Sequence, residues 1–298
     1  MNEVVAAERR LAPIHLAALL VAIFSWGIGP VLTLATDFSI NAVIFYRTLF
    51  WPPVLLTVML IRKVPVQVEG IKASFVPGLF FGFSTITGFL AFHETSIANA
   101  TVIGNVSAAL ALFLAPRMLG ERTTLVQVGF AVSSFVGVAA VVFGSGGTGG
   151  ATLWGDTLAL INAFLWTGYF MTGKQARLDG VNTWSFLFGV SINQLVVVMP
   201  WVLVTANDLW NPSLRDIAVV MAMVLLPGTI GHGLMVWTQR FVTAGTISLL
   251  SLLGPVLSMV FAWWFFGQGV AAVQLLGAAV VLLSLAGVVR YGERSPTS

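Results

Sequence analysis

The sequence predicts an all-α polytopic membrane protein, with ten transmembrane helices arranged as two inverted five-helix repeats and both termini in the cytoplasm. Three observations predict it: the composition, the spacing of apolar runs and the distribution of cationic residues. Of the 298 residues, 58% are hydrophobic and only 8% are charged, whereas about a quarter of the residues in a soluble domain are charged. Because such a chain cannot cover itself with polar surface, we expect its surroundings to be a lipid bilayer.

Apolar runs long enough to cross the roughly 30 Å hydrocarbon core, about 20 residues each, recur along the whole chain. Ten are found, at residues 14–35, 40–61, 72–93, 97–118, 124–144, 153–173, 183–205, 215–238, 243–266 and 270–290. Turn-forming or charged segments separate them. A glycine-rich segment, GSGGTGG, comes after the fifth run. We therefore expect a first repeat at 1–143, a linker at 144–152 and a second repeat at 153–298.

The cationic residues fall on one side of the membrane if the ten spans alternate in direction. Twelve of the 14 do so: Arg9, Arg10, Arg62, Lys63, Lys72, Arg117, Arg122, Lys174, Arg177, Arg240, Arg290 and Arg294. Arg215 falls in an opposite-side loop, and Arg47 falls inside the second span. Since Lys and Arg concentrate in cytoplasmic loops, this distribution predicts cytoplasmic termini. A miscount by one span would scatter the charges over both sides.

The two halves echo each other at a nearly constant offset. Trp26 in AIFSWG aligns with Trp166 in NAFLWTGYF at an offset of 140. Further pairs are Gly88 with Gly233 and Thr101 with Thr246 at 145, and Gly120 with Gly267 and Gln127 with Gln274 at 147. Five spans in each half is an odd number, so the halves would enter the membrane from opposite sides. Inverted repeats of this kind are typical of transporters.

Five short motifs are spread over nearly the whole chain. They are Trp26–Gly27, the FYRTLF stretch with Arg47, ETSIANATV, the LGER turn at Gly120–Glu121, and Leu253–Gly254–Pro255. Together they resemble the EamA-type branch of the drug/metabolite transporter (DMT) superfamily, most of all its bacterial aromatic amino-acid exporters. Gln268 departs from the pattern, because an acidic residue usually stands there. The resemblance implies a bacterial inner-membrane protein that exports amino acids or related metabolites through a cavity between spans 1, 3, 4, 6, 8 and 9.

Polar side chains inside the spans are candidates to line that cavity, because a polar group facing hydrocarbon is costly. Span 6 places Asn162, Trp166 and Tyr169 on one helix face, at i, i+4 and i+7. The other candidates are Trp26, Phe80, Ser84, Thr101, Asn105, His232, Ser248 and Ser251. Both tryptophans of the aligned pair fall near the midplane, where their rings can stack on a planar ligand. For each Ser or Thr, hydrogen bonding between packed helices is the alternative.

Four ionisable residues need separate interpretation. His232 lies deep in span 8, which favours substrate binding or proton transfer; the alternative is a neutral histidine hydrogen-bonded to a neighbouring hydroxyl. His93 and Glu94, near the outer end of span 3, are further candidates for proton coupling. For Arg47 we expect a structural pairing with a carboxylate or with backbone carbonyls.

Three residues are candidates for bends that gate the cavity. Gly228 and Gly231 follow Pro227 in span 8, and Pro255 lies inside span 9. A proline or glycine inside a membrane helix removes or weakens its backbone hydrogen bonds, and such a break is tolerated only beside protein or a wet cavity. We therefore expect these three positions to border the substrate path.

The function we expect is export of amino acids, above all aromatic or bulky apolar ones, by alternating access. Span 1 carries no embedded carboxylate, which argues against small cationic-drug exporters, and the core has no Lys or Arg cluster for phosphorylated substrates. Export of other small metabolites or drugs is the alternative. An intramembrane enzyme is the other, but Ile97 replaces the second histidine of a zinc-protease motif after His93–Glu94, and no GxSxG motif occurs.

The expected partners are a small-molecule substrate and the lipid bilayer. We expect no catalytic residues, no cofactor, no metal, no nucleic acid, and a monomer. The chain has no cysteine and therefore no thiolate metal site. Whether export is coupled to the proton gradient or runs as facilitated diffusion is left open by the sequence.

Overall fold

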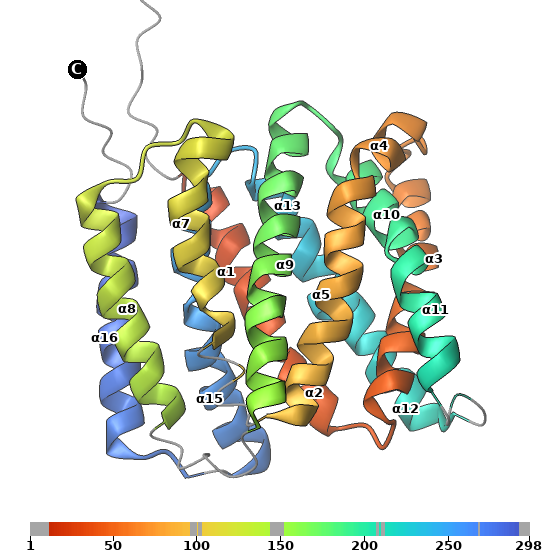
Figure 1. Ribbon diagram of the computed structural model, residues 1–298. Coiled ribbons are helices and arrows are strands. Elements are labelled where there is room, and N and C mark those ends of the chain that lie inside the picture. The colour runs from red at the N-terminus through yellow and green to blue at the C-terminus, as the bar shows by residue number, and fades with distance from the viewer. Residues whose placement is uncertain are drawn as a thin grey trace, which may run out of the picture.

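A computed structural model describes residues 12–95, 100, 103–143, 152–206, 209, 212–267 and 269–291. Within them every regular element is a helix (Figure 1). The elements are α1 (Pro13–Gly27), α2 (Gly29–Leu34), α3 (Ile40–Ile61), α4 (Val68–Ala73), α5 (Phe75–Glu94), α7 (Val106–Leu119), α8 (Leu125–Phe143), α9 (Leu153–Leu178), α10 (Thr183–Asn193), α11 (Leu195–Thr205), α12 (Leu214–Met223), the π-helix η1 (Val224–Gly231), α13 (His232–Thr238), α14 (Ala244–Ser251), α15 (Leu253–Phe266) and α16 (Ala272–Tyr291).

Among the described residues, six helical segments are long and apolar enough to cross a membrane. They are Pro13–Thr33, Ile40–Ile61, Phe75–Glu94, Thr183–Thr205, Leu214–Thr238 and Ala244–Phe265. Val106–Leu119, Leu125–Ala140 and Ala272–Val288 are shorter apolar helices. The helix α9 is 26 residues long but more polar, because it carries Asp156, Asn162 and Lys174. The chain is thus a multi-pass membrane protein, and the count of ten spans stays a prediction.

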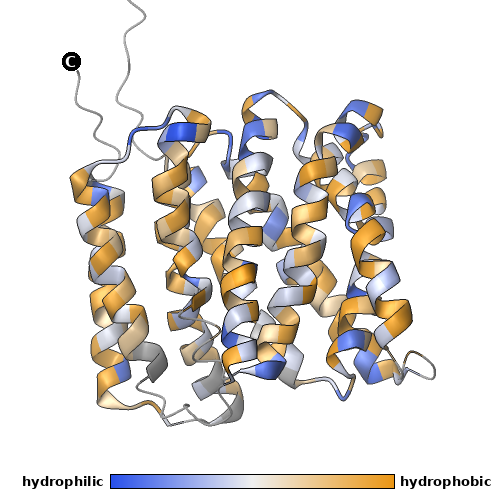
Figure 2. Ribbon diagram, in the orientation of Figure 1, coloured by the Kyte–Doolittle hydropathy of each residue, from blue (hydrophilic) through white to orange (hydrophobic). Residues whose placement is uncertain are grey.

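The outward faces of the helices are apolar along their length. Large aliphatic side chains such as Leu60, Ile61, Leu125, Val204 and Leu283 are largely exposed. Figure 2 shows hydrophobic residues along the middle of the helices and hydrophilic ones gathered toward the two ends of the bundle. A soluble monomer rarely exposes so much contiguous apolar surface. The helices therefore present to their surroundings the surface that lipid tails require.

Several of the predicted spans are broken rather than continuous. Span 1 has a one-residue interruption at Ile28 between α1 and α2, and span 7 has one at Gln194 between α10 and α11. Span 9 breaks at Leu252, between α14 and α15. Span 8 passes through the π-helix η1, which contains a proline. The start predicted for span 3 was about residue 72; that residue belongs to the short α4, and the long helix α5 starts at Phe75 after Ser74.

Residues paired at the offset of 147 occupy equivalent local structure. Gly120 and Gly267, each at the end of a helix, have φ angles of +66° and +63°. Gln127 Oε1 accepts a hydrogen bond of 3.0 Å from the backbone N–H of Thr124, and Gln274 Oε1 accepts one of 2.8 Å from that of Ala271. The same offset separates the residue before α7, Asn105, from the break at Leu252. Thr101, from the pair at 145, lies outside the described residues, as do Gln268 and most of the 144–152 linker.

Several contacts between helices are the same when each helix is replaced by its counterpart in the other half of the chain. The helix α8 packs along α16, α7 on α14, and α3 on α10, so each of these pairs joins corresponding helices of the two predicted repeats. The contact of α5 with α9 has its counterpart in the contact of α1 with η1 and α13. Figure 1 shows the α3–α4, α7–α8 and α9–α10 connections at one end of the bundle. The cationic Arg62, Lys63 and Arg122 lie in two of these connections.

The two turn glycines generate a prediction about stability. Gly120→Ala and Gly267→Ala should each lower the free energy of unfolding by about 1 kcal/mol, because a side chain makes a left-handed backbone unfavourable. No neighbouring atom would meet the added Cβ at either position, so backbone strain is the only cause. The measurement is unfolding in mixed detergent micelles. Gly129→Ala is the control, since it also meets no neighbour but lies within α8 at a negative φ; an equal loss there would contradict the interpretation.

Candidate functional site

Five aromatic rings surround His232, the first residue of α13. Their centroids lie between 5.1 and 6.0 Å from that of the imidazole, and they belong to Trp26, Trp51, Phe81, Trp166 and Tyr169. The rings come from α1, α3, α5 and α9, so the cluster joins four helices that are distant in sequence. His232 is only 3% exposed, and its Nδ1 lies 3.4 Å from the hydroxyl of Tyr169. We call these six residues the aromatic cluster.

The tryptophan pair predicted from the repeat meets inside the cluster. The rings of Trp26 and Trp166 lie 5.6 Å apart at 77°, an edge-to-face arrangement that is favoured between aromatic rings. Trp26 Nε1 donates a hydrogen bond of 3.1 Å to the carbonyl oxygen of Pro227. A Cβ on Gly231 would lie 2.7 Å from that Nε1 atom. The glycine and the wide turn of η1 therefore allow the indole to reach the helix backbone.

A small cavity lies beside the tryptophan pair. Its volume is about 40 Å³, and it is lined by Trp26, Asn105, Ser107, Ala108, Ala111, Trp166, Thr167, Phe170, Met235, Ser248 and Ser251. The structure thus brings together five of the predicted cavity residues: Trp26, Asn105, Trp166, Ser248 and Ser251. A pocket for a small-molecule ligand usually measures some 300–1,000 Å³. A ligand of that size can enter only if the surrounding helices move apart.

Helix breaks border this cavity on two sides. Asn105 immediately precedes α7, and its Nδ2 is buried without a hydrogen-bond partner. Ser251 is the last residue of α14, just before the break at Leu252, and its hydroxyl donates to the carbonyl oxygen of Ile247. Pro255 lies in the first turn of α15, after this break. The unpaired Asn105 amide is thus available at the cavity wall.

Three other predicted cavity residues lie in contacts between helices. Asn162 Oδ1, on α9, accepts hydrogen bonds from the hydroxyls of Ser84 at 2.7 Å and Thr87 at 3.4 Å, both on α5. Phe80 packs against Gly168, where an added Cβ would lie 2.8 Å from its ring. These contacts hold α5 against α9, and a substrate role for the three residues stays a prediction.

The structure does not bring His93 and Glu94 to the aromatic cluster. They lie at the end of α5, with the imidazole Nδ1 3.2 Å from the carboxylate. The side chain of His93 is 66% exposed, unlike that of the deeply buried His232. Of the residues predicted for proton coupling, only His232 lies in the bundle interior.

Several residues of the site were missed by the sequence analysis. Trp51 and Phe81 belong to the aromatic cluster, and Thr167 and Phe170 line the cavity. Phe81 adjoins the predicted Phe80, and one residue along a helix turns the side chain by about 100°. Trp51 lies one helix turn after Arg47 and so shares its face, which is a signal that could have found it.

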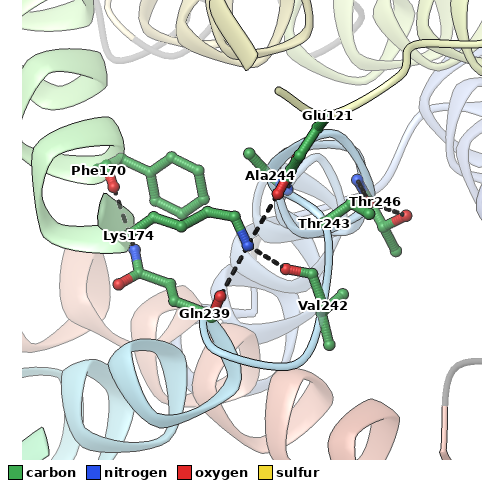
Figure 3. Close-up of polar contacts among 8 residues, drawn as sticks. All are labelled: Glu121, Phe170, Lys174, Gln239, Val242, Thr243, Ala244 and Thr246. Carbon is green, nitrogen blue, oxygen red and sulfur yellow. Dashed lines mark hydrogen bonds and ion pairs between the residues drawn. The ribbon is translucent and has the colours of Figure 1, made fainter. Parts of the chain in front are cut away.

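A buried ion pair lies at the end of the bundle where the α7–α8 and α9–α10 connections lie. Figure 3 shows its contacts. Lys174 Nζ lies 3.0 Å from Glu121 Oε1 and donates to the carbonyl oxygens of Gln239, at 2.7 Å, and Val242. The other carboxylate oxygen accepts a 2.7 Å hydrogen bond from the N–H of Ala244, at the start of α14. The pair joins the α7–α8 turn, α9 and the α13–α14 turn.

The loop position predicted for Lys174 is wrong. The sixth span was expected to end at residue 173, but α9 continues to Leu178. Lys174 is 2% exposed and Arg177 is 4% exposed, and Arg177 Nε donates to the carbonyl oxygen of Val236. Carbonyls at the end of α13 and in the following turn satisfy both cations, so the helix continues past the charges.

A bundle of apolar, interrupted helices around a cavity lined by polar and aromatic residues is the architecture of a membrane transporter. The comparison with known families agrees: residues 13–143 and 153–290 each match the EamA-like transporter family. The chain therefore belongs to this family, whose members are transporters. A solved crystal structure has the same fold, with a TM-score of 0.76 over 94% of this chain and 99% of its own, at 18% sequence identity.

The contact between Trp26 and η1 can be tested at Gly231. Gly231→Ala should displace the indole from the carbonyl of Pro227, because its Cβ would overlap Nε1 at 2.7 Å. Transport should fall several-fold, and the tryptophan fluorescence spectrum of the purified protein should shift. In the matched control, Gly228→Ala, the nearest atom would be a backbone oxygen at 3.1 Å, with Trp51 Nε1 at 3.6 Å. Equal effects of the two variants would contradict a specific role for Gly231.

The buried ion pair allows a second test. Lys174→Met should lower the free energy of unfolding by on the order of 3 kcal/mol, because it leaves the Glu121 carboxylate without its cation. Adding Glu121→Gln to that variant should recover part of the loss. The control is the exposed pair of Arg215 with Asp37, whose charged atoms lie 3.2 Å apart. Arg215→Met should lower the free energy of unfolding by less than about 1 kcal/mol. Equal losses at both pairs would contradict the assignment.

Proposed function

We propose that this EamA-family transporter exports amino acids, above all aromatic or bulky apolar ones, from the bacterial cytoplasm across the inner membrane. The observation that carries the proposal is the position of Trp26 and Trp166, which belong to the aromatic cluster and also line the cavity. Aromatic faces stack on a planar side chain and suit bulky apolar ones. The substrate would be bound where the two halves of the chain meet.

The other residues of the cavity wall support a substrate without a strongly charged side chain. They offer hydroxyl and amide groups from Asn105, Thr167, Ser248 and Ser251, and no charged residue lines the described cavity. The backbone at the two helix breaks supplies dipoles that can hold the charged groups of a zwitterion.

The proposed mechanism is alternating access by two inverted repeats. It is supported by the contacts between corresponding helices of the two halves and by the equivalent turns at Gly120 and Gly267. The Lys174–Glu121 ion pair closes the end that carries most of the cationic connections, which we assign to the cytoplasm together with both termini. Opening that end would separate Glu121 from Lys174 and from the N–H of Ala244. The transporter would work as a monomer.

If export is coupled to protons, His232 is the residue we propose to carry the proton. It is the histidine in the aromatic cluster, and its Nδ1 faces the hydroxyl of Tyr169. His93 and Glu94 pair with each other at the exposed end of α5, and we assign them no part in proton transfer. Transport with and without a pH gradient separates coupled export from facilitated diffusion.

The decisive experiment is transport in proteoliposomes with labelled phenylalanine, tryptophan, leucine and alanine, beside a cationic dye. We expect transport of the aromatic and bulky amino acids. Trp166→Ala should lower transport of the aromatic ones several-fold to about tenfold, since ring contacts contribute about 0.5–1.5 kcal/mol. The matched control is Trp264→Ala, whose ring is 73% exposed on the outer surface.

Two outcomes would overturn the proposal. One is movement of the cationic dye but of no amino acid, which would assign the protein to another substrate class. The other is a Trp166→Ala variant that transports every substrate at the wild-type rate, which would remove the tryptophan pair from the binding site.

A further inference from the structure

In the described part of the chain, one cation of the helix bundle has neither an ion-pair partner nor a hydrogen-bond partner. Arg47 is on α3, in the second predicted span, and is half-buried. Its guanidinium carbon lies 5.3 Å from the centroid of the Phe89 ring. Among the described residues it makes no hydrogen bond and no ion pair, so the pairing expected from the sequence is not found there. A charge held within a membrane-spanning segment without an acceptor is costly, and such residues commonly mark a ligand or ion path.

The carboxylates near the start of α3 are engaged elsewhere. Asp37 pairs with Arg215 at 3.2 Å. Asp216 accepts hydrogen bonds from the hydroxyls of Thr36 and Ser213 and from the N–H of Asp37. Guanidinium groups carry five N–H donors and no acceptor. The Arg47 donors therefore remain available for an acceptor that is not part of the described chain.

The surroundings of Arg47 link it to the aromatic cluster. Trp51 follows it by one helix turn on the same face of α3, and the Trp51 indole Nε1 is a second buried donor without a partner. The ring of Trp51 lies 5.6 Å from that of His232. One face of α3 thus presents a cation and a neutral donor at the border of an apolar, aromatic surface.

We propose that Arg47 binds the carboxylate of the substrate, with the Trp51 indole N–H as a second donor, while the aromatic cluster holds the side chain. The planar guanidinium matches a carboxylate with two parallel hydrogen bonds. A phosphate dianion would call for a second cation, and no other described Lys or Arg faces this cluster. This inference rests on the proposed function and deepens it, because it names the substrate group that is recognised.

An anionic lipid headgroup has the same chemistry as an acceptor. Arg47 lies seven residues after Ile40, the first residue of α3, or roughly 10 Å along the helix axis. Its guanidinium packs over the ring of Phe89 of α5. A position between helices and well below the helix end favours the substrate over the lipid.

The test compares acids with their amides in binding to the full-length protein in nanodiscs. The probes are phenylalanine and phenylalaninamide, and 3-phenylpropionate and 3-phenylpropionamide, in discs with and without phosphatidylglycerol. We expect the wild type to bind each acid about tenfold to a hundredfold more tightly than its amide, the range of charge-assisted hydrogen bonds. Arg47→Gln should abolish that preference, Arg47→Lys should keep part of it, and Arg215→Gln, the exposed control, should leave it unchanged.

Several results would overturn the inference. One is an acid preference that survives in Arg47→Gln; another is a wild type that shows none. A third is loss in Arg47→Gln of phosphatidylglycerol stabilisation alone, which would assign the arginine to lipid. If Arg47→Gln does not fold, an undiminished preference in Arg47→Lys serves as the overturning result. A wild type that binds phenylpropionate through Arg47 but moves no amino acid would retain this inference and reject the proposed function.

Discussion

The structure depends on one constraint: hydrocarbon offers no hydrogen bonds, so each polar group in the membrane must find its partner within the protein. Helices satisfy their own backbone, which is why every described regular element is helical. Polar side chains at helix ends, such as those of Asn105 and Ser251, line the cavity. The apolar residues that remain cover the outside (Figure 2). The same constraint therefore produces both the lipid-facing surface and the polar interior.

This constraint separates structural polar groups from functional ones. Asn162 with Ser84, Trp26 with Pro227, and Lys174 with Glu121 are satisfied pairs that each join two helices or turns. Among the described donors, the Asn105 amide, the Ser134 hydroxyl, the Trp51 indole and Arg47 have no hydrogen-bond partner; Trp51 belongs to the aromatic cluster, and Arg47 precedes it by one turn of α3. Unsatisfied donors that gather at one place are best explained by an acceptor that arrives from outside the chain. Residues of the same chemical type thus have different roles according to whether they have a partner.

Much of the fold could be predicted because hydropathy and internal offset report on features that do not depend on tertiary detail. The offset of 147 aligned Gly120 with Gly267, which have similar positive φ angles, and the offset of 140 aligned Trp26 with Trp166, whose rings are in contact. Side-chain direction was less accessible: the rotation between Phe80 and Phe81 decides which ring enters the cluster. The position of Lys174 was missed for another reason, because carbonyls and a carboxylate from distant turns make its burial favourable, and no local pattern shows them.

A buried ion pair is a physically suitable closure for such a transporter. Burying two charges costs desolvation energy that their attraction only roughly repays. When the Lys174–Glu121 pair separates toward water, hydration replaces the lost attraction, so open and closed arrangements can lie close in free energy. An apolar plug would instead expose its surface to water on opening and favour the closed state strongly. Alternating access needs states of similar free energy that a bound substrate can shift, and the carbonyls of Gln239 and Val242 make the pair specific to the closed arrangement.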